Sequence, residues 1–333
     1  MHVPTASKLP TTIVAPGSTR RRREQSFWQR VSANRWCYVF LAPMLILFLV
    51  FTIYPLFASL GYTFYQWNGI GDPSAFVGLD NFVQVMHDPL FWGSFEHTFI
   101  YMIVLVPVQL ALALALALVL NNPNLRFATF YRSVYFLPVV TSPAVVGVVI
   151  QLLLTNFGDD FNKLLLNLHL ISHHIDWLGD PHFALAIIIG VGIWNTLGYN
   201  LVYFLAGLQT IPREYYEASR LDGANAISQF FLITIPLLRG IGLVILILAI
   251  LGSLQVFDLV QVLTGGGPYF ATDVVNTYIY HQAFGGFGTN AVQPNIGFAS
   301  AASFFYGLLI LLIALAQLPV VRYASRQRRD YKL

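Results

Sequence analysis

The sequence predicts an all-α polytopic membrane protein with six transmembrane helices. Of its 333 residues, 56% are hydrophobic and only 10% are charged, and the mean hydropathy is +0.65, which together lie outside the usual range of soluble domains. Six uncharged runs reach the length of about 20 residues that a helix needs to cross a bilayer. They cover residues 37–61, 98–120, 133–154, 183–208, 240–257 and 298–321.

The second run contains a pattern that is typical of a strand. Residues 109–120 read QLALALALALVL, in which Leu and Ala alternate with a period of two. Ala and Leu are strong helix formers, and an isolated strand in lipid would leave its backbone groups without hydrogen-bond partners. We therefore expect this run to be part of a helix.

The positions of the basic residues predict the orientation of the six spans. With the N-terminus in the cytoplasm, 17 of the 18 Lys and Arg residues fall on the cytoplasmic side and only Lys163 falls outside. Both termini are therefore expected in the cytoplasm, as a flexible basic tail at 1–35 and a second basic tail at 322–333, with the membrane domain at 36–321 between them. We interpret the run Arg20 to Arg23 as a topology signal that touches anionic lipid, not as a nucleic-acid site.

The cytoplasmic loop between the fourth and fifth spans, residues 210–236, is unusually structured. Pro212 suits a helix start, and Gly223 suits a helix end because glycine accepts the left-handed conformation of C-terminal caps. A second helix at 224–235 would follow, with Pro236 marking the approach to the membrane. The apolar side chains of this helix-Gly-helix segment suit either a groove on a partner protein or the surface of the bilayer.

This loop carries a motif of a known family. Glu217-Ala218-Ser219, followed at the matching spacing by Gly223, Ile233 and Ile235-Pro236, resembles the EAA loop (EAA-x3-G-x9-I-x-L-P) of membrane subunits of ABC importers. Ser219 and Ile235 are conservative departures from the pattern. The resemblance implies that this loop is the coupling helix that docks on a cytoplasmic ATPase subunit. The coupling residues so implied are Glu217, Ala218, Ser219, Asp222, Gly223, Ile233 and Pro236.

Further segments resemble the carbohydrate-uptake branch of these permeases, similar to those for maltose and glycerol phosphate. They are 77–82 (VGLDNF), 88–92 (DPLFW), 135–138 (YFLP), 257–258 (FD), 263–268 (LTGGGP), 278–280 (YIY) and 283–284 (AF). The resemblance covers about 36–317. It implies alternating access in a prokaryotic plasma membrane, with four partners: a second homologous permease, two ATP-binding subunits and an extracellular solute-binding protein.

The sequence lacks the motif of a self-contained pump. A phosphate-binding Walker loop requires Lys after Gly, yet the lysines are Lys8, Lys163 and Lys332, and none follows a glycine. We therefore expect no cofactor in this chain, with ATP and Mg²⁺ bound by the partner subunits. No Ser/His/Asp spacing indicates a catalytic site, so an enzyme embedded in the membrane is disfavoured.

Uncharged polar side chains in the fourth and fifth spans predict a path for the substrate, because such groups are costly in lipid. Amides and carboxylates bind sugar hydroxyls, and aromatic rings stack on the apolar face of a sugar. Hydrogen bonding between helices is an equally good explanation for any one of them, and we assign Gln109 to packing on that ground. The candidate pathway residues are Asn195, Tyr199, Asn200, Tyr203, Gln255, Asp258 and Gln261.

The loop between the third and fourth spans concentrates His and Asp residues. His169 and His173 have helical spacing, but no acidic residue stands at a matching position, so we expect no metal site. The acids of the loop are expected to be solvated or to meet the extracellular binding protein: Asp159, Asp160, Asp176 and Asp180. Two alternatives to a sugar permease remain, an ABC permease for a peptide or another solute and an ATP-independent channel or facilitator.

Overall fold

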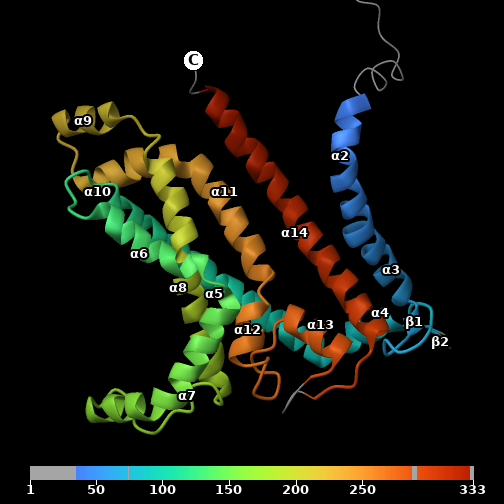
Figure 1. Cartoon of the computed structure of the whole chain (residues 1–333). Helices are drawn as coiled ribbons and strands as arrows, with labels where there is room; N and C mark the ends of the chain where they lie inside the picture. The colour runs from blue at the N-terminus through green and yellow to red at the C-terminus, as the bar shows by residue number, and fades with distance from the viewer. Residues whose placement is uncertain (1–34, 74, 287–290, 331–333) are drawn as a thin grey trace, which may run out of the picture. The chain divides into compact units, whose positions relative to one another are not determined.

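The computed structural model describes residues 35–73, 75–286 and 291–330, so the predicted tail at 1–35 lies almost wholly outside the described residues. Two compact units divide the chain, Met1–Leu56 and Phe57–Leu333. In the described part, six helices are long and apolar enough to cross a membrane, which confirms the predicted all-α class with six spans (Figure 1). They are Trp36–Tyr62, Pro89–Leu120, Pro143–Asn167, Pro181–Leu208, Ala226–Leu254 and Ile296–Pro319.

The first span combines α2 (Arg35–Phe48), the π-helix η1 (Leu49–Ile53) and α3 (Tyr54–Tyr62). Pro55 follows the π-helix closely, at the second residue of α3. Proline lacks the N–H of a regular helix and its ring crowds the carbonyl four residues earlier, so a widened turn before it accommodates the ring. The same arrangement recurs at Pro236, which follows the π-helix η2 (Phe230–Thr234).

A small polar segment leads from the first span to the second. The strands β1 (Tyr65–Gln66) and β2 (Ala75–Phe76) pair antiparallel, and the helix α4 (Asp80–His87) follows. The buried amide of Asn81 donates to the carbonyls of Thr63 at 2.8 Å and Tyr65 at 3.0 Å, which fixes α4 to this segment. The second span, α5 (Pro89–Leu120), begins earlier than expected because Asp88 caps it by accepting from Leu90 N at 2.7 Å.

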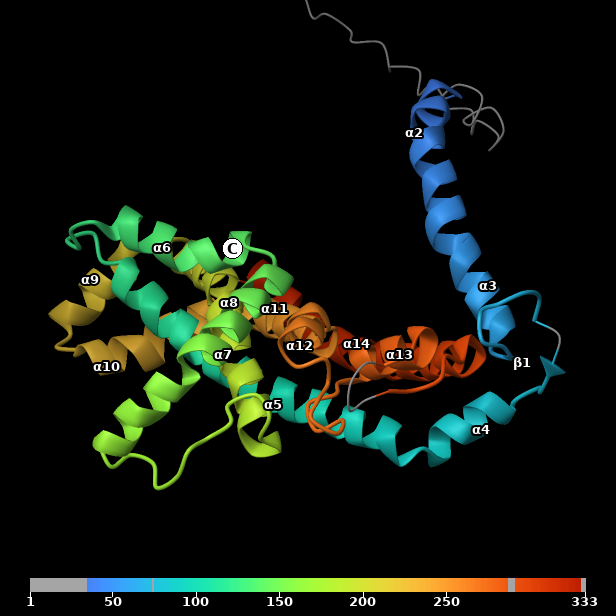
Figure 2. The ribbon, with the colours of Figure 1, turned by 60° about the horizontal axis from the view of Figure 1, so that its bottom comes forward.

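The centre of the second unit is the packing of α5 on α8 (Pro181–Leu208), which lie side by side in Figures 1 and 2. The Leu/Ala run is helical, as predicted, and Ala113 and Ala117 are fully buried in it. Small side chains let the two helices approach closely. One polar bridge crosses this contact, from the Thr196 hydroxyl of α8 to Oε1 of Gln109 on α5.

The third predicted span, 133–154, is wrong in its bounds. The structure forms α6 (Ala128–Val140), breaks the helix at Thr141 and Ser142, and restarts it as α7 (Pro143–Asn167). Proline at a first helical position lacks only an N–H that would have no helical partner, so Pro143 favours a new helix start. The candidate membrane span is α7, and α6 packs against α8.

The fourth and fifth spans are joined by α9 (Arg213–Leu221) and α10 (Ala226–Gln229) at the end of α8 away from the α7–α8 loop (Figure 1). We expected a separate helix at 224–235 ending near Pro236. Instead α10 continues through η2 into α11 (Ile235–Leu254) as one helical span. Pro236 lies in the first turn of α11, after the π-turn, so it does not end the helix.

The chain closes with α12 (Asp258–Leu263), α13 (Val275–Phe284) and the long α14 (Ile296–Asp330). The hydroxyl of Tyr306 on α14 donates to the carbonyl of Leu254 at 2.6 Å and so ties α14 to the end of α11. Phe91, Tyr278 and Phe298 form an aromatic core among α5, α13 and α14. The backbone of α14 extends through most of the predicted basic tail at 322–333.

Candidate functional site

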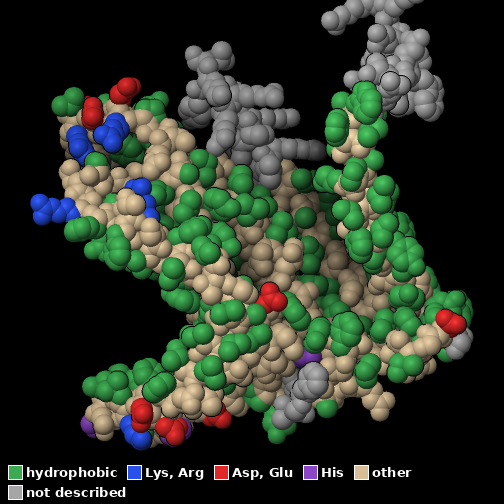
Figure 3. Space-filling model, viewed as in Figure 1, with side chains coloured by type: hydrophobic (Ala, Val, Ile, Leu, Met, Phe, Trp, Pro, Cys, Tyr) green, Lys and Arg blue, Asp and Glu red, His purple; other side chains and the backbone are tan. Residues whose placement is uncertain are grey.

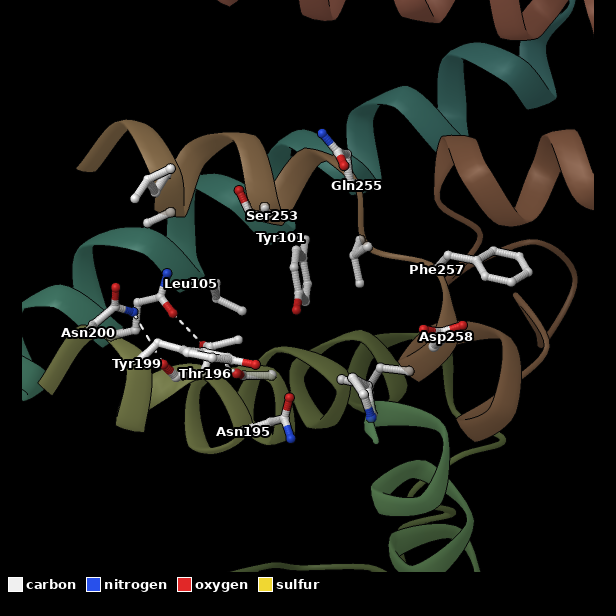
Figure 4. Close-up of a pocket in the computed structure, with 18 of the residues that line it drawn as sticks. Tyr101, Leu105, Asn195, Thr196, Tyr199, Asn200, Ser253, Gln255, Phe257 and Asp258 are labelled. Carbon is white, nitrogen blue, oxygen red and sulfur yellow. Dashed lines mark hydrogen bonds between the residues drawn. The ribbon is translucent and has the colours of Figure 1, made fainter. Parts of the chain in front are cut away.

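The second unit, Phe57–Leu333, contains a cavity of about 400 Å³ among α5, α8, the end of α11 and the start of α12. Figure 4 shows Tyr101 of α5 between Ser253 and Gln255 on one side and Thr196 of α8 on the other. Its lining mixes aromatic, aliphatic and uncharged polar side chains with one carboxylate, that of Asp258. A pocket of this size and composition suits a small organic ligand oriented by a few polar contacts.

One stripe of α8 supplies most of the polar wall. Asn195, Tyr199 and Tyr203 stand four residues apart, so they share a face of the helix. Asn195 is 6% exposed and donates through Nδ2 to the carbonyl of Pro138 on α6 at 2.9 Å, which leaves its Oδ1 as an acceptor. Tyr199 and Tyr203 are each 45% exposed, so their ring faces are accessible.

A second stripe of α8 is held more tightly. Thr196 donates both to the carbonyl of Gly192 at 2.8 Å and to Gln109, and Asn200 donates to the carbonyl of Thr196 at 3.3 Å. A Cβ at Gly192 would lie 2.8 Å from Cδ1 of Leu105 and would collide with the hydroxyl of Tyr101, so a larger residue here would displace both side chains. The absence of a side chain at Gly192 thus leaves room for the Tyr101 ring in the cavity wall.

Six of the seven predicted pathway residues line the cavity: Asn195, Tyr199, Asn200, Tyr203, Gln255 and Asp258. Gln261 is not among the lining residues, and its Oε1 is buried elsewhere in the fold. Sequence reasoning missed Tyr101 and Thr196. It assigned Gln109 to contacts between helices, which agrees with the bridge from α5 to α8, but it did not foresee that Gln109 also lines the cavity. The missed signal was an aromatic hydroxyl within an otherwise apolar run.

The α9–α10 segment contains the predicted coupling residues and is built around Gly223. The backbone N–H of Gly223 donates to Arg220 O at 3.1 Å and that of Ala224 to Ser219 O at 2.9 Å, which is the Schellman pattern of helix ends. Gly223 has φ +81°, a conformation that a residue with a Cβ adopts only with strain. The chain therefore turns sharply between α9 and α10.

Ser219 has a defined role in this turn. Its hydroxyl donates to Tyr216 O at 2.9 Å and accepts from Nε2 of Gln229 on α10 at 3.0 Å. Tyr216 makes a second link, through a 3.0 Å hydrogen bond between its hydroxyl and that of Thr234. These side chains fix the angle between α9 and the base of the fifth span.

The outer surface of this segment exposes several large apolar side chains among charged ones. Leu221 is 90% exposed and Leu232 is 75% exposed, and Glu217 and Ala218 are exposed beside them. Further exposed apolar side chains include Tyr215, Ile227, Phe231 and Ile235. Figure 3 shows Lys and Arg atoms gathered over the same end of the unit.

The four acids at the end of α7 and in the α7–α8 loop have hydrogen-bond partners within the chain, which sequence reasoning did not foresee. Asp180 caps α8 by accepting from His182 N at 2.9 Å, and Asp176 accepts from Gly179 N at 2.9 Å. Asp159 pairs with His174 at 3.0 Å, and Asp160 pairs with Lys163 at 2.9 Å. Asp159 and Asp160 remain 80% and 71% exposed, so they are solvated as expected, and their contact with a binding protein stays a prediction.

A buried polar cluster beyond the cavity was not predicted. Asp273 is fully buried; it accepts from the Thr277 hydroxyl and lies 3.6 Å from Nδ1 of His281. Burial raises the pKa of Asp273, and the nearby His281 and Thr277 oppose that shift. Tyr278 follows Thr277 on α13, and its hydroxyl donates to Asp88 at 2.5 Å. Burial raises the pKa of the Tyr278 phenol.

Comparison with known proteins decides the family. Residues 109–326 match the family described as the inner membrane component of binding-protein-dependent transport systems. The chain belongs to this family. Relatives include the lactose transport system permease protein LacF of Rhizobium radiobacter, 35% identical over 89% of this chain and 95% of LacF. The probable ABC transporter permease protein YurN of Bacillus subtilis is 34% identical over 84% of this chain and 94% of YurN.

Other family members and solved structures agree over most of the chain. The sn-glycerol-3-phosphate transport system permease protein UgpA of Shigella flexneri is 30% identical over 86% of this chain and 93% of UgpA. The crystal structure of a bacterial ABC transporter that imports the acidic polysaccharide alginate contains a similar chain, with a TM-score of 0.73 and 23% identity over 90% of this chain and 99% of that one. This likeness shows a shared fold. As a permease of this family, the chain is a multi-pass membrane component of a transport system.

Proposed function

We propose that the chain is one of two homologous permease subunits of an ATP-driven importer that takes up a carbohydrate by alternating access. The cavity carries this proposal: amide, hydroxyl and carboxylate groups converge there with the rings of Tyr101, Tyr199 and Tyr203. Hydroxyl-rich solutes are bound by such acceptors, and their C–H faces pack on aromatic rings. Relatives named for lactose and arabinooligosaccharide transport favour a sugar over a peptide.

The partners follow from the same proposal. An extracellular binding protein delivers the solute, and two ATPase subunits bind ATP and Mg²⁺ on the cytoplasmic side. Both termini lie in the cytoplasm of a prokaryotic cell. The basic atoms gathered around α9 and α10 support this orientation, because positive residues are retained on the cytoplasmic side of a membrane.

In this mechanism, α9 and the turn at Gly223 dock on an ATPase subunit. The exposed apolar residues of α9 and α10 enter its groove, and movement of the ATPases is transmitted through the continuous helix that joins α10 to α11. Because α11 ends at the cavity wall, a displacement of its base reaches Ser253 and Gln255. The π-helix η2 lies between the segment that docks on the ATPase and the cavity.

The proposal is tested at Gly223. Proline fixes φ near −65°, so Gly223→Pro abolishes the turn that needs φ +81°, whereas Gly223→Ala keeps open space around its Cβ and costs about 1 kcal/mol of strain. In the assembled transporter we expect Gly223→Pro to insert normally but to lose uptake coupled to ATP hydrolysis. Gly223→Ala should retain most uptake.

The measurements are solute uptake and ATP hydrolysis in proteoliposomes that contain all subunits. Normal uptake by Gly223→Pro would reject the coupling role of this segment. Loss of membrane insertion in both variants would mean that the turn serves folding only, which also contradicts the proposal.

A further inference from the structure

The electrostatic character of the cavity goes beyond what a sugar permease requires. Among the described residues that line it, Asp258 is the one acidic side chain. The others are amides, hydroxyls, phenols and apolar groups, and no Lys, Arg or His stands among them. The cavity wall of this chain therefore offers a negative charge and no positive one.

The cations of the described chain lie elsewhere. Arg132 donates through Nη2 to Leu120 O at 2.7 Å at the end of α5, and Lys163 pairs with Asp160 in α7. Arg213 and Arg220 belong to α9, Arg239 lies near the start of α11, and Arg126 precedes α6. None of these four lines the cavity. On the face shown in Figure 3, the visible Lys and Arg atoms lie toward two ends of the unit, and none is visible on the coloured surface between them.

An anionic solute would meet two penalties in this cavity. It would lose hydration without gaining a cation, and it would approach the carboxylate of Asp258. Asp258 is exposed in the wall at the first position of α12, so its oxygens are accessible to an entering solute. Like charges at contact distance disfavour binding by roughly tenfold or more.

A neutral polyol meets neither penalty. Two adjacent hydroxyls can donate to the carboxylate oxygens of Asp258, and hydrogen bonds to a charged acceptor are the stronger kind. Oδ1 of Asn195 accepts another hydroxyl, since its Nδ2 is occupied by Pro138 O. The exposed rings of Tyr199 and Tyr203 are left for the apolar face of the solute.

We propose that the solute is an uncharged saccharide and that Asp258 excludes carboxylated and phosphorylated ones. This inference rests on the proposed function and deepens it. It separates the chain from relatives named for anionic solutes, such as the sn-glycerol-3-phosphate permease UgpA, and from the alginate importer that shares its fold. Asp258 is then a specificity-determining residue.

The test measures binding to the purified complex of both permeases and both ATPases, without the extracellular binding protein, so that the selectivity of that protein does not enter. The probes are radiolabelled neutral mono- to tetrasaccharides and the uronate of each, in which one CH₂OH is oxidised to a carboxylate. We expect wild type to prefer the neutral sugar by roughly tenfold or more. Asp258→Asn should lose most of that preference, whereas Glu96→Gln, an exposed carboxylate of α5 outside the cavity, should keep it.

Each outcome decides between the two proposals. Equal binding of a sugar and its uronate by wild type would overturn the inference and leave the proposed function standing. An unchanged preference in Asp258→Asn would remove the role of Asp258. If no neutral saccharide binds but a peptide does, both the proposed function and this inference fail.

Discussion

Gly192 shows how one missing side chain shapes the cavity. A Cβ there meets the Tyr101 hydroxyl and Leu105, so Gly192→Ala must displace the Tyr101 ring; overpacking of this kind costs about 1–3 kcal/mol. Gly190, on the same helix, is the matched control, because a Cβ there meets nothing within 4 Å. We expect Gly192→Ala to lower both the melting temperature and solute uptake, and Gly190→Ala to change neither.

Thermal unfolding in detergent and uptake in proteoliposomes measure the two effects. If Gly192→Ala had the melting temperature and the uptake of Gly190→Ala, the contact between α5 and α8 would accommodate the added Cβ without loss of stability. It would also argue that the position of Tyr101 is not used in transport.

We expect the buried carboxyl of Asp273 to make the stability of the fold depend on pH. Burial raises the pKa of its carboxyl above the ordinary value of 3.8, so the folded chain holds this proton more tightly than the unfolded chain. The contribution of Asp273 to stability is therefore complete below about pH 4 and declines as pH rises toward the folded pKa. Asp273→Asn removes this titration while keeping the size of the side chain.

Melting temperatures measured across a pH series test this prediction. We expect wild type to lose more stability than Asp273→Asn as pH rises through that window. Parallel curves for the two proteins would mean that the buried carboxyl has the same proton affinity in the folded and unfolded chains.

Residue identities in α8 were predictable because polarity is conspicuous in an apolar span. Asn195 and Asn200 stand out among aliphatic neighbours, and helical periodicity places Tyr199 and Tyr203 on the stripe of Asn195. For Tyr101 the sequence offered only a hydroxyl in an apolar run, since its place in the wall depends on the absence of a side chain at Gly192, far along the chain. Contacts between helices of this kind have no signature in local sequence.

At the scale of elements, long apolar runs predicted the number of membrane spans among the described residues well and the ends of the helices poorly. Hydropathy identifies segments that are apolar enough to be stable in lipid, whereas the ends of the helices depend on capping residues and on packing. Asp88 starts α5 outside the apolar run, and the break at Thr141 and Ser142 lies inside one. Pro236 was interpreted as a boundary, but a π-turn absorbs it and keeps α10 and α11 continuous.

That continuity changes how the EAA-like motif is understood. Its first half, Glu217 to Gly223, forms a short helix and a turn, while its second half, Ile233 to Pro236, lies within the base of a membrane span. Ser219 departs from the motif, yet it is the residue that accepts from Gln229 and joins the two halves. The motif therefore describes a joint between the exposed segment and the membrane domain.

At the scale of the whole molecule, the family was predictable from the spacing of this motif together with the six apolar runs that surround it. The cavity was not, because its wall draws on α5, α8, α11 and α12, which are distant in sequence. A motif that binds a partner is local and keeps its spacing, whereas a solute site in a helical bundle is assembled across spans.

We expect that this chain alone does not form a complete transport pathway. Exposed apolar residues line several of its spans, as expected for one half of a pathway that packs against a second permease and lipid. In proteoliposomes we expect no sugar flux through this chain by itself or with the second permease alone. Flux should appear only with both ATPases, the binding protein and ATP, and a non-hydrolysable ATP analogue should not support repeated turnover. Sugar equilibration through the chain alone would identify it as a facilitator, because a passive pathway needs neither coupling at Gly223 nor a source of energy.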